Sequence, residues 1–221
     1  MKLKLFLLFI LLAGFCLNSF AQVAEFSQSK VTEISEAESF ARWDFEISST
    51  RYEVLSSGRA KKISAKNTVT KFNLPLGKNE TVYSNVFFAQ HKTDLILLYE
   101  ANMGGEGLGY IAAFDSSSMN LKWKAVINGF NVGKGLLENQ FAYLTAIGFV
   151  AKINLLTGKY VWKHDNLYRR FNENGAFNIF ETPELEKSNV IFTEKTHDNI
   201  VNIIVANKTS GRIIRTILDG K

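Results

Sequence analysis

Two stretches of the sequence contain residue types that bind phosphate in other proteins. Gly158 and Lys159 stand together as in a phosphate-binding loop, and residues 104–109 read GGEGLG. A Walker loop needs another glycine five positions before its Gly-Lys pair, where this chain has Ile153. A dinucleotide-binding fingerprint needs a third glycine at position 110, which is Tyr110. Both stretches are therefore expected to form hairpin loops.

The histidines give no sign of a metal site or a catalytic site. His91, His164 and His197 lie far apart in the sequence, and none has a second ligand at a metal-binding spacing. The neighbouring Asp165 and Asp198 do not form a catalytic arrangement on their own. The sequence thus predicts no catalytic residue, no cofactor-binding residue and no metal ligand, and we expect a protein that is not an enzyme.

Residues 1–21 have the layout of a secretory signal peptide. Two lysines precede an apolar run, Leu5–Leu17, and the small residues Ser19 and Ala21 follow it. The run is shorter than the roughly 20 residues that a membrane-spanning helix needs. We expect cleavage after Ala21 and export to the periplasm or the extracellular space, with an uncleaved anchor as the alternative.

The position of the single cysteine predicts that the mature chain has no disulfide. Cys16 lies in the predicted signal peptide, and Phe15 occupies the position that is small in bacterial lipoprotein sites. Cleavage would remove Cys16, so we expect no disulfide in the mature chain.

Removing Lys2 and Lys4 lowers the net charge from +5 to +3. No run of Lys or Arg exceeds two, so we expect neither nucleic-acid binding nor a basic membrane-binding face, and the short apolar run predicts no membrane span.

After residue 45 the sequence consists of short runs rich in Val, Ile, Phe and Tyr, interrupted by Gly, Asn, Asp and Ser. This pattern predicts strands joined by hairpins. The predicted strands are Val82–Ala89, Asp94–Glu100, Tyr110–Phe114, Leu121–Ile127, Leu136–Leu137, Phe141–Ile147, Phe149–Ile153, Tyr160–Trp162, Ala176–Glu181, Asn189–Thr193, Ile200–Ala206 and Arg212–Leu218. One short helix is expected, over Thr32–Arg42.

Three decapeptides repeat a common pattern: FDSSSMNLKW from Phe114, INLLTGKYVW from Ile153 and ANKTSGRIIR from Ala206. An Asp or Asn in second place can accept a backbone N–H two residues on and so begin a turn. Gly158 and Gly211 can adopt the positive φ that a tight hairpin requires. Met119 breaks this pattern, so its loop is expected to differ.

The pattern apolar-Asp/Asn-x-x-Thr-Gly-Lys-x-x-Trp resembles the repeat of quinoprotein-type β-propellers, in which each repeat is one blade of four antiparallel strands. The resemblance covers about residues 81–218 and implies blades at about 81–127, 128–167 and 168–221. Residues 22–80 are expected to hold a divergent first unit, because Ser57-Gly58-Arg59 is similar to Ser210-Gly211-Arg212. The fold expected is all-β, with about four blades.

Blade number bears on closure of the ring. Propellers have about four to eight blades, and the chain has room for four or five. We expect a compact closed propeller. Two alternatives are an open stack that closes by self-association and a truncated relative of larger propellers.

The resemblance also bears on function. Quinone-dependent enzymes of this type stack the quinone between a Trp and an adjacent-cysteine disulfide and bind Ca²⁺ through acidic residues. None of those residues can be matched here, so no cofactor is expected. The resemblance therefore favours a noncatalytic scaffolding or binding module for a protein or peptide partner. The alternatives are binding of a carbohydrate or cell-surface ligand and, less favoured, a quinone-dependent oxidoreductase.

Overall fold

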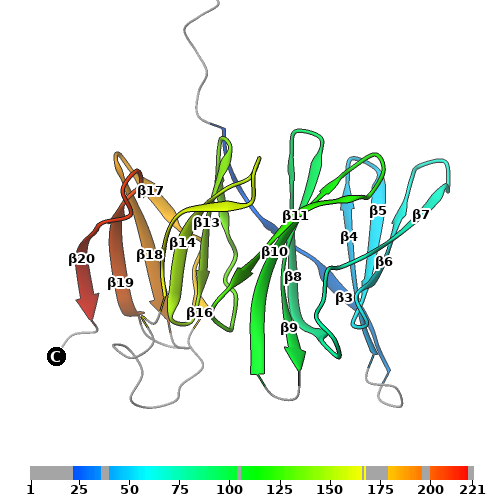
Figure 1. Cartoon of the computed structure of the whole chain (residues 1–221), viewed down its shortest axis with the longest axis horizontal. Coiled ribbons are helices and arrows are strands. Elements are labelled where there is room, and N and C mark those ends of the chain that lie inside the picture. The colour runs from blue at the N-terminus through cyan, green and yellow to red at the C-terminus, as the bar shows by residue number, and fades with distance from the viewer. Residues whose placement is uncertain are drawn as a thin grey trace, which may run out of the picture.

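The chain forms an all-β array of four antiparallel sheets (Figure 1). The computed structural model describes residues 22–35, 40–103, 106–165, 167, 179–195 and 200–218. The predicted signal peptide and His197 lie outside these residues. All regular elements in the described ranges are strands, and within them no helix has the length and apolarity to cross a membrane.

In the described ranges each sheet has five strands, one more than expected. Sheet 1 has the order β3-β4-β5-β6-β7 and sheet 2 the order β2-β8-β9-β10-β11. Their strands are β2 (Ser27–Gln28), β3 (Lys30–Ser35), β4 (Phe40–Ile47), β5 (Thr50–Leu55), β6 (Arg59–Ile63), β7 (Val69–Asn73), β8 (Thr81–His91), β9 (Asp94–Met103), β10 (Glu106–Asp115) and β11 (Leu121–Ile127).

Sheet 3 has the order β1-β12-β13-β14-β15. In sheet 4 both β16 and β17 pair with β18, which is followed by β19 and β20. Their strands are β1 (Val23–Glu25), β12 (Leu136–Glu138), β13 (Phe141–Ala146), β14 (Phe149–Asn154), β15 (Lys159–His164), β16 (Ile179–Phe180), β17 (Glu184–Glu186), β18 (Asn189–Lys195), β19 (Ile200–Asn207) and β20 (Ile213–Leu218).

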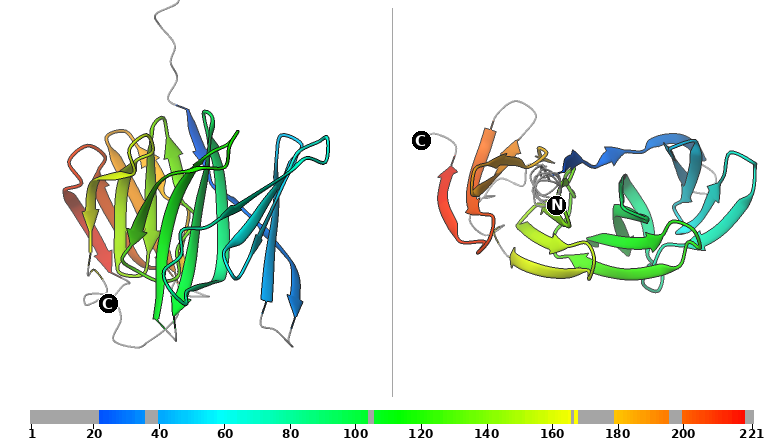
Figure 2. Two further views of the ribbon diagram at one scale, coloured as in Figure 1. Left: turned by 45° about the vertical axis from the view of Figure 1, so that its right-hand side comes forward. Right: turned by 90° about the horizontal axis from the view of Figure 1, so that it is seen from above.

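The sheets pack face to face along an arc, with sheet 1 and sheet 4 at its two ends (Figure 2). Apolar clusters fill the spaces between sheets 1 and 2, sheets 2 and 3, and sheets 3 and 4. No such cluster joins sheet 4 to sheet 1 in the described ranges. The expectation of a closed ring was therefore wrong, because the three packing steps between the four sheets do not complete a circle.

The first described residues tie three sheets together. Strand β1 pairs with β12 of sheet 3, β2 pairs with β8 of sheet 2, and β3 pairs with β4 of sheet 1. Between β1 and β2, Phe26 is fully buried in the cluster of sheets 2 and 3. Its backbone N–H donates to the carbonyl oxygen of Gly135 at 3.1 Å. This segment, residues 22–35, is called the strap below.

The short helix predicted over Thr32–Arg42 was wrong, since β3 and β4 occupy its described residues. The physical reason lies in the residues that follow. Trp43 and Phe45 alternate with charged residues and are buried against sheet 2. This period of two fits a half-buried strand, and packing of the two aromatic rings outweighs the helical preference of the nearby glutamates.

The repeated decapeptides form equivalent hairpins, as predicted. In each, the third strand of the repeat carries a bulge and pairs with the fourth strand in the same register. The side chains of Asp115, Asn154 and Asn207 each accept a backbone N–H from the residue two positions on. The Oδ1 acceptor thus begins all three turns, which is the role expected of it from the sequence.

The turn that contains Met119 does not differ from the others, contrary to expectation. Met119 adopts a φ of 59°, close to the 67° of Gly158 and the 72° of Gly211. Its N–H donates to the carbonyl oxygen of Asp115 at 2.8 Å, as Gly158 does to Asn154. A left-handed φ costs roughly 1–2 kcal/mol in a residue with a Cβ. Burial of the Met119 side chain between sheets 1 and 2 offsets this cost.

A side chain from each of sheets 1, 2 and 3 contacts the turn of the next sheet. Trp123 Nε1 donates to the carbonyl oxygen of Leu155, and Trp162 Nε1 donates to that of Lys208. In sheet 1, Lys62 takes the corresponding place and donates from Nζ to the carbonyl oxygen of Ser116. These acceptors all directly follow the Asp or Asn that begins the turn, so one hydrogen bond recurs at all three sheet interfaces.

Candidate binding groove on the first sheet

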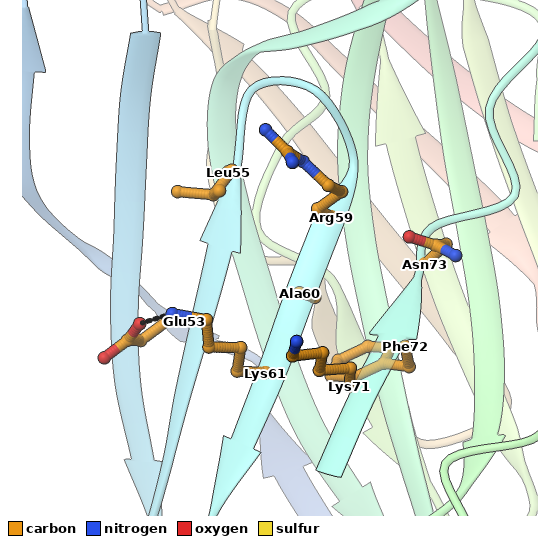
Figure 3. Close-up of a pocket in the computed structure, with 8 residues that line it drawn as sticks. All are labelled: Glu53, Leu55, Arg59, Ala60, Lys61, Lys71, Phe72 and Asn73. Atoms are coloured by element: carbon orange, nitrogen blue, oxygen red, sulfur yellow. Dashed lines mark ion pairs between the residues drawn. The ribbon is translucent and has the colours of Figure 1, made fainter. Parts of the chain in front are cut away.

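A groove lies on the face of sheet 1 that points away from sheet 2. Its volume is about 410 Å³, and strands β5, β6 and β7 form it (Figure 3). The residues that line it are Glu53, Leu55, Arg59, Ala60, Lys61, Lys71, Phe72 and Asn73. Since the sheet forms one end of the array, this face is open to a ligand in the described part of the chain.

Strand register places the charged side chains of the groove in rows. Glu53 of β5 pairs with Lys61 of β6, which pairs with Lys71 of β7. Directly paired residues project from the same face of a sheet. Arg59 and Asn73 form the adjacent row. The opposite face presents Phe72 to the core, so a period of two separates the charged groove from the apolar packing.

Glu53 is the buried carboxylate of the groove, with a side chain only 9% exposed. Burial by itself would raise its pKa. The Arg51 guanidinium, which donates a hydrogen bond and pairs with it, acts with the charges of Lys61 and Arg42 to hold the pKa below its ordinary value. The Lys61 ammonium lies 3.6 Å from the second carboxylate oxygen. Glu53 is therefore ionised at neutral pH and its charge is compensated within the protein.

Two further cations have no carboxylate partner among the described residues. Lys71 is exposed and forms no ion pair there, and Arg59 donates from Nε to the hydroxyl of Ser57 at 3.3 Å. With Glu53 compensated by Arg51 and Lys61, the groove keeps a net positive charge. It can attract an anionic group, because uncompensated cations in a concave surface concentrate the positive potential.

Strand β7 borders the groove and is the outer strand of its sheet. In the described residues no strand pairs with its far side, so alternate backbone N–H and C=O groups point outward. Such an edge can accept an extended peptide as an additional strand. Lys71 at its middle disfavours pairing with a basic or neutral strand. The same charge favours an acidic one.

The residues that first suggested chemistry lie elsewhere. Gly158 ends the turn before β15, whose first residue is Lys159, and Gly107 and Gly109 lie within strand β10 instead of the expected hairpin loop. His164 Nε2 contacts the carbonyl oxygen of Gly211 at 2.7 Å, so this histidine joins sheets 3 and 4. The structure therefore brings none of them into the groove.

The groove itself was missed in the sequence. Lys61 and Lys62 form a basic run of two in the sequence, too short to indicate a binding site, although Arg59 and Lys61 alternate with buried Ala60. The same alternation around Phe72 brings Lys71 and Asn73 to one face. The available signal for the groove was the alternation in these two runs, in which every second residue is polar and therefore lies on the same face. Which strands would lie adjacent was not visible in the sequence.

The tryptophans of the described ranges pack between sheets. Trp43 is buried between sheets 1 and 2, whereas Trp123, which is partly buried, and Trp162 lie against Gly158 and Gly211 of the next sheet. Within the described ranges no three His, Cys, Asp or Glu residues gather to hold a metal ion.

Comparison with known proteins shows the fold alone. Neither the family models nor the curated proteins match the sequence. Among solved structures, a europium-containing methanol dehydrogenase matches 80% of this chain at 12% identity with a TM-score of 0.50, and this chain spans 41% of its length. Apo AztD from Citrobacter koseri matches 90% of this chain and 87% of its own at 11% identity, but its TM-score of 0.34 supports no argument. The chain has a propeller-like, quinoprotein-type fold.

Proposed function

We propose that this chain is an exported, noncatalytic binding module, and that an acidic segment of a protein or peptide partner is its ligand. The groove on sheet 1 is the observation on which this proposal rests. It combines uncompensated Lys71 and Arg59 with a free strand edge, β7. An extended peptide can pair its backbone with β7 and direct every second side chain into the groove. Carboxylates at those positions would face Lys71 and Arg59.

The positive charge of the groove accounts for the proposed preference for an acidic peptide. Exposed ion pairs contribute about 0.2–1 kcal/mol each, so two or three of them change affinity by about one order of magnitude. Backbone pairing along β7 would supply the remaining binding free energy, which is independent of sequence. The proposal therefore predicts weak to moderate affinity, a strict need for an extended conformation and clear sensitivity to salt.

Fluorescence polarisation with three labelled ten-residue peptides tests the proposal. All three alternate Thr with a second residue, which is Glu, Gln or Lys. We expect the Glu peptide to bind at low salt and to lose affinity as salt is added, and we expect the Lys peptide not to bind. Lys71→Glu and Arg59→Glu should each weaken binding by about fivefold or more, because attraction is replaced by repulsion.

A matched control is Lys159→Glu, which reverses an exposed charge on sheet 3 and should leave binding unchanged. Hydrogen exchange on the complex provides a second measurement, because strand addition would protect outward N–H groups of β7. Equal binding of the three peptides, or no effect of Lys71→Glu, would refute the proposal. An acidic oligosaccharide that binds more tightly than the Glu peptide would instead favour the carbohydrate alternative.

Export has its own test. Expression of the full chain with its native first residues, followed by mass spectrometry of the exported fraction, should give a polypeptide that begins at Gln22. A chain that keeps residues 1–21 in the membrane fraction would indicate an uncleaved anchor.

A further inference from the structure

The outer face of sheet 4 repeats a face that is buried elsewhere in the array. In sheet 3, register aligns Tyr143, Lys152 and Trp162 in one row, and this row lies beneath sheet 4. The same register in sheet 4 aligns Ile191, Val205 and Arg215. These residues point away from sheet 3, because the alternate residues of the same strands form the cluster with sheet 3.

The outer face of sheet 4 is apolar at its centre. Ile191 and Val205 lie side by side, and Thr193, Ile203 and Ile217 form the next row. Ile217 is 36% exposed, and none of these four aliphatic residues belongs to a core cluster in the described chain. A contiguous patch of β-branched aliphatic side chains at the end of an array indicates a surface that another molecule covers.

The two ends of the array differ. The outer face of sheet 1 carries the charged row of Glu53, Lys61 and Lys71, with Ile63 and Val69 in the neighbouring row. The turn between β5 and β6 also cannot accept a side chain from another sheet at the carbonyl oxygen of Ser56, because that oxygen already accepts the N–H of Val82. Head-to-tail stacking of copies, sheet 4 against sheet 1, would bury Lys71, which has no carboxylate partner among the described residues, and is therefore disfavoured.

A second copy of the chain can cover the apolar outer face of sheet 4 when the sheet 4 faces of the two copies pack against each other. The row begins at Glu184 on β17, which pairs with Ile191, and ends at Arg215 on β20. Both terminal residues are exposed. A two-fold axis parallel to the strands reverses the row of one copy against the other. Glu184 of each copy then faces Arg215 of the other, and Ile191 faces Val205.

We propose that the outer face of sheet 4 is an isologous dimer interface, with Ile191, Val205, Ile203 and Ile217 at its centre and Glu184–Arg215 ion pairs at its rims. Self-complementary patches of this kind are what two-fold dimers require. The two charged grooves on sheet 1 would then lie at opposite ends of an eight-sheet assembly. The dimer does not depend on what the grooves bind.

Charge-reversal variants of Glu184 and Arg215 test the proposed dimer interface. Sedimentation velocity across a concentration series gives the mass and the dimer dissociation constant of the mature chain. We expect a dimer, with Arg215→Glu and Glu184→Arg each weakening it at least about tenfold, because each places two like-charged pairs at the rims. The double variant Glu184→Arg with Arg215→Glu should recover most of the affinity. Lys71→Glu on sheet 1 is the matched control and should leave the mass unchanged.

The outcomes separate the alternatives. Ile203→Glu should give a monomer with an unchanged melting curve at low concentration, which distinguishes loss of the interface from loss of folding. A wild-type monomer at all concentrations, an association unaffected by the charge variants, or filaments of increasing mass would each overturn the proposal. Failure of the peptide-binding test leaves these masses unaffected, so the two proposals can fail separately.

Discussion

Trp162 donates a hydrogen bond from Nε1 to the main-chain carbonyl oxygen of Lys208, which lies 46 residues further along the chain, at 3.1 Å. The same indole ring lies against Gly211, where a Cβ atom would come within 2.5 Å of the ring. The Trp162 side chain of sheet 3 therefore makes two contacts with the turn of sheet 4. It donates a hydrogen bond to a backbone carbonyl oxygen, and its ring fills the space that a side chain at position 211 would occupy. Trp123 repeats the arrangement on Leu155 and Gly158.

Replacement of Trp162 by alanine should lower the free energy of unfolding by about 3–5 kcal/mol, because a buried aromatic ring is lost from between two sheets. Trp162→Phe should cost less. The carbonyl oxygen of Lys208 keeps a second donor, Lys152 Nζ at 3.0 Å, and so stays satisfied. Urea denaturation measures both variants. A Trp162→Ala variant that melts normally would show that the ring does not stabilise the interface.

Gly211→Ala should destabilise the protein by more than about 2 kcal/mol. The φ of 72° accounts for about 1–2 kcal/mol, and the clash with the Trp162 ring adds to it. A double-mutant cycle separates the two causes. In the Trp162→Ala background the clash disappears, so the cost of Gly211→Ala should fall to the φ contribution. Additive effects of the two substitutions would contradict the packing of Trp162 on Gly211.

Phe26→Ala should destabilise sheets 2 and 3 together, by about 3–5 kcal/mol, because the ring is fully buried in their shared cluster. Hydrogen exchange should then increase in both β8 and β12, the strands that pair with the strap. Val23→Ala is the control on the same segment, since Val23 is 51% exposed. Exchange that increases in only one of the two strands would mean that the strap does not couple the sheets.

Glu138 should make the interface of sheets 3 and 4 sensitive to acid. Burial would raise its pKa, but hydrogen bonds from the Lys208 ammonium at 2.6 Å and the Tyr143 hydroxyl at 2.7 Å hold the pKa below its ordinary value of 4.5. A folded pKa below the unfolded one means that the stabilisation is complete above the unfolded pKa. It is lost as the pH falls through the folded pKa.

The corresponding variant is Glu138→Gln. The free-energy difference from the wild type should be largest near pH 6 and should decrease as the pH falls below about 4.5, with urea denaturation at each pH as the measurement. A difference that stays constant from pH 6 to pH 3 would argue against an ionised Glu138 at this interface.

The repeating hairpins could be predicted from the sequence because their determinants are local. An Asp or Asn side chain that accepts the N–H two residues on is a contact within one turn, and it was identified at Asp115, Asn154 and Asn207. The Met119 loop was predicted wrongly. Its left-handed φ is stabilised by burial between two sheets, and no local signal reports that burial.

The strap and the groove depend on contacts between distant segments. Nothing in Val23–Gln28 distinguishes strands that pair with β8 and β12 from an exposed linker, because their partners lie far along the chain. Likewise, Glu53, Lys61 and Lys71 are charged residues on three separate runs until strand register aligns them. Register depends on the whole sheet, so a property of one run cannot specify it.

The sequence by itself determined the all-β composition, the positions of the hairpins and the tryptophans that follow them, since turn chemistry and period-two alternation act over a few residues. Only the tertiary structure decided that the four sheets form an open arc, with a charged face at one end and an apolar face at the other. The physical reason is that closure and end faces depend on the angle between packed sheets and on which side of each strand is covered. Those quantities come from packing of side chains over long sequence separations.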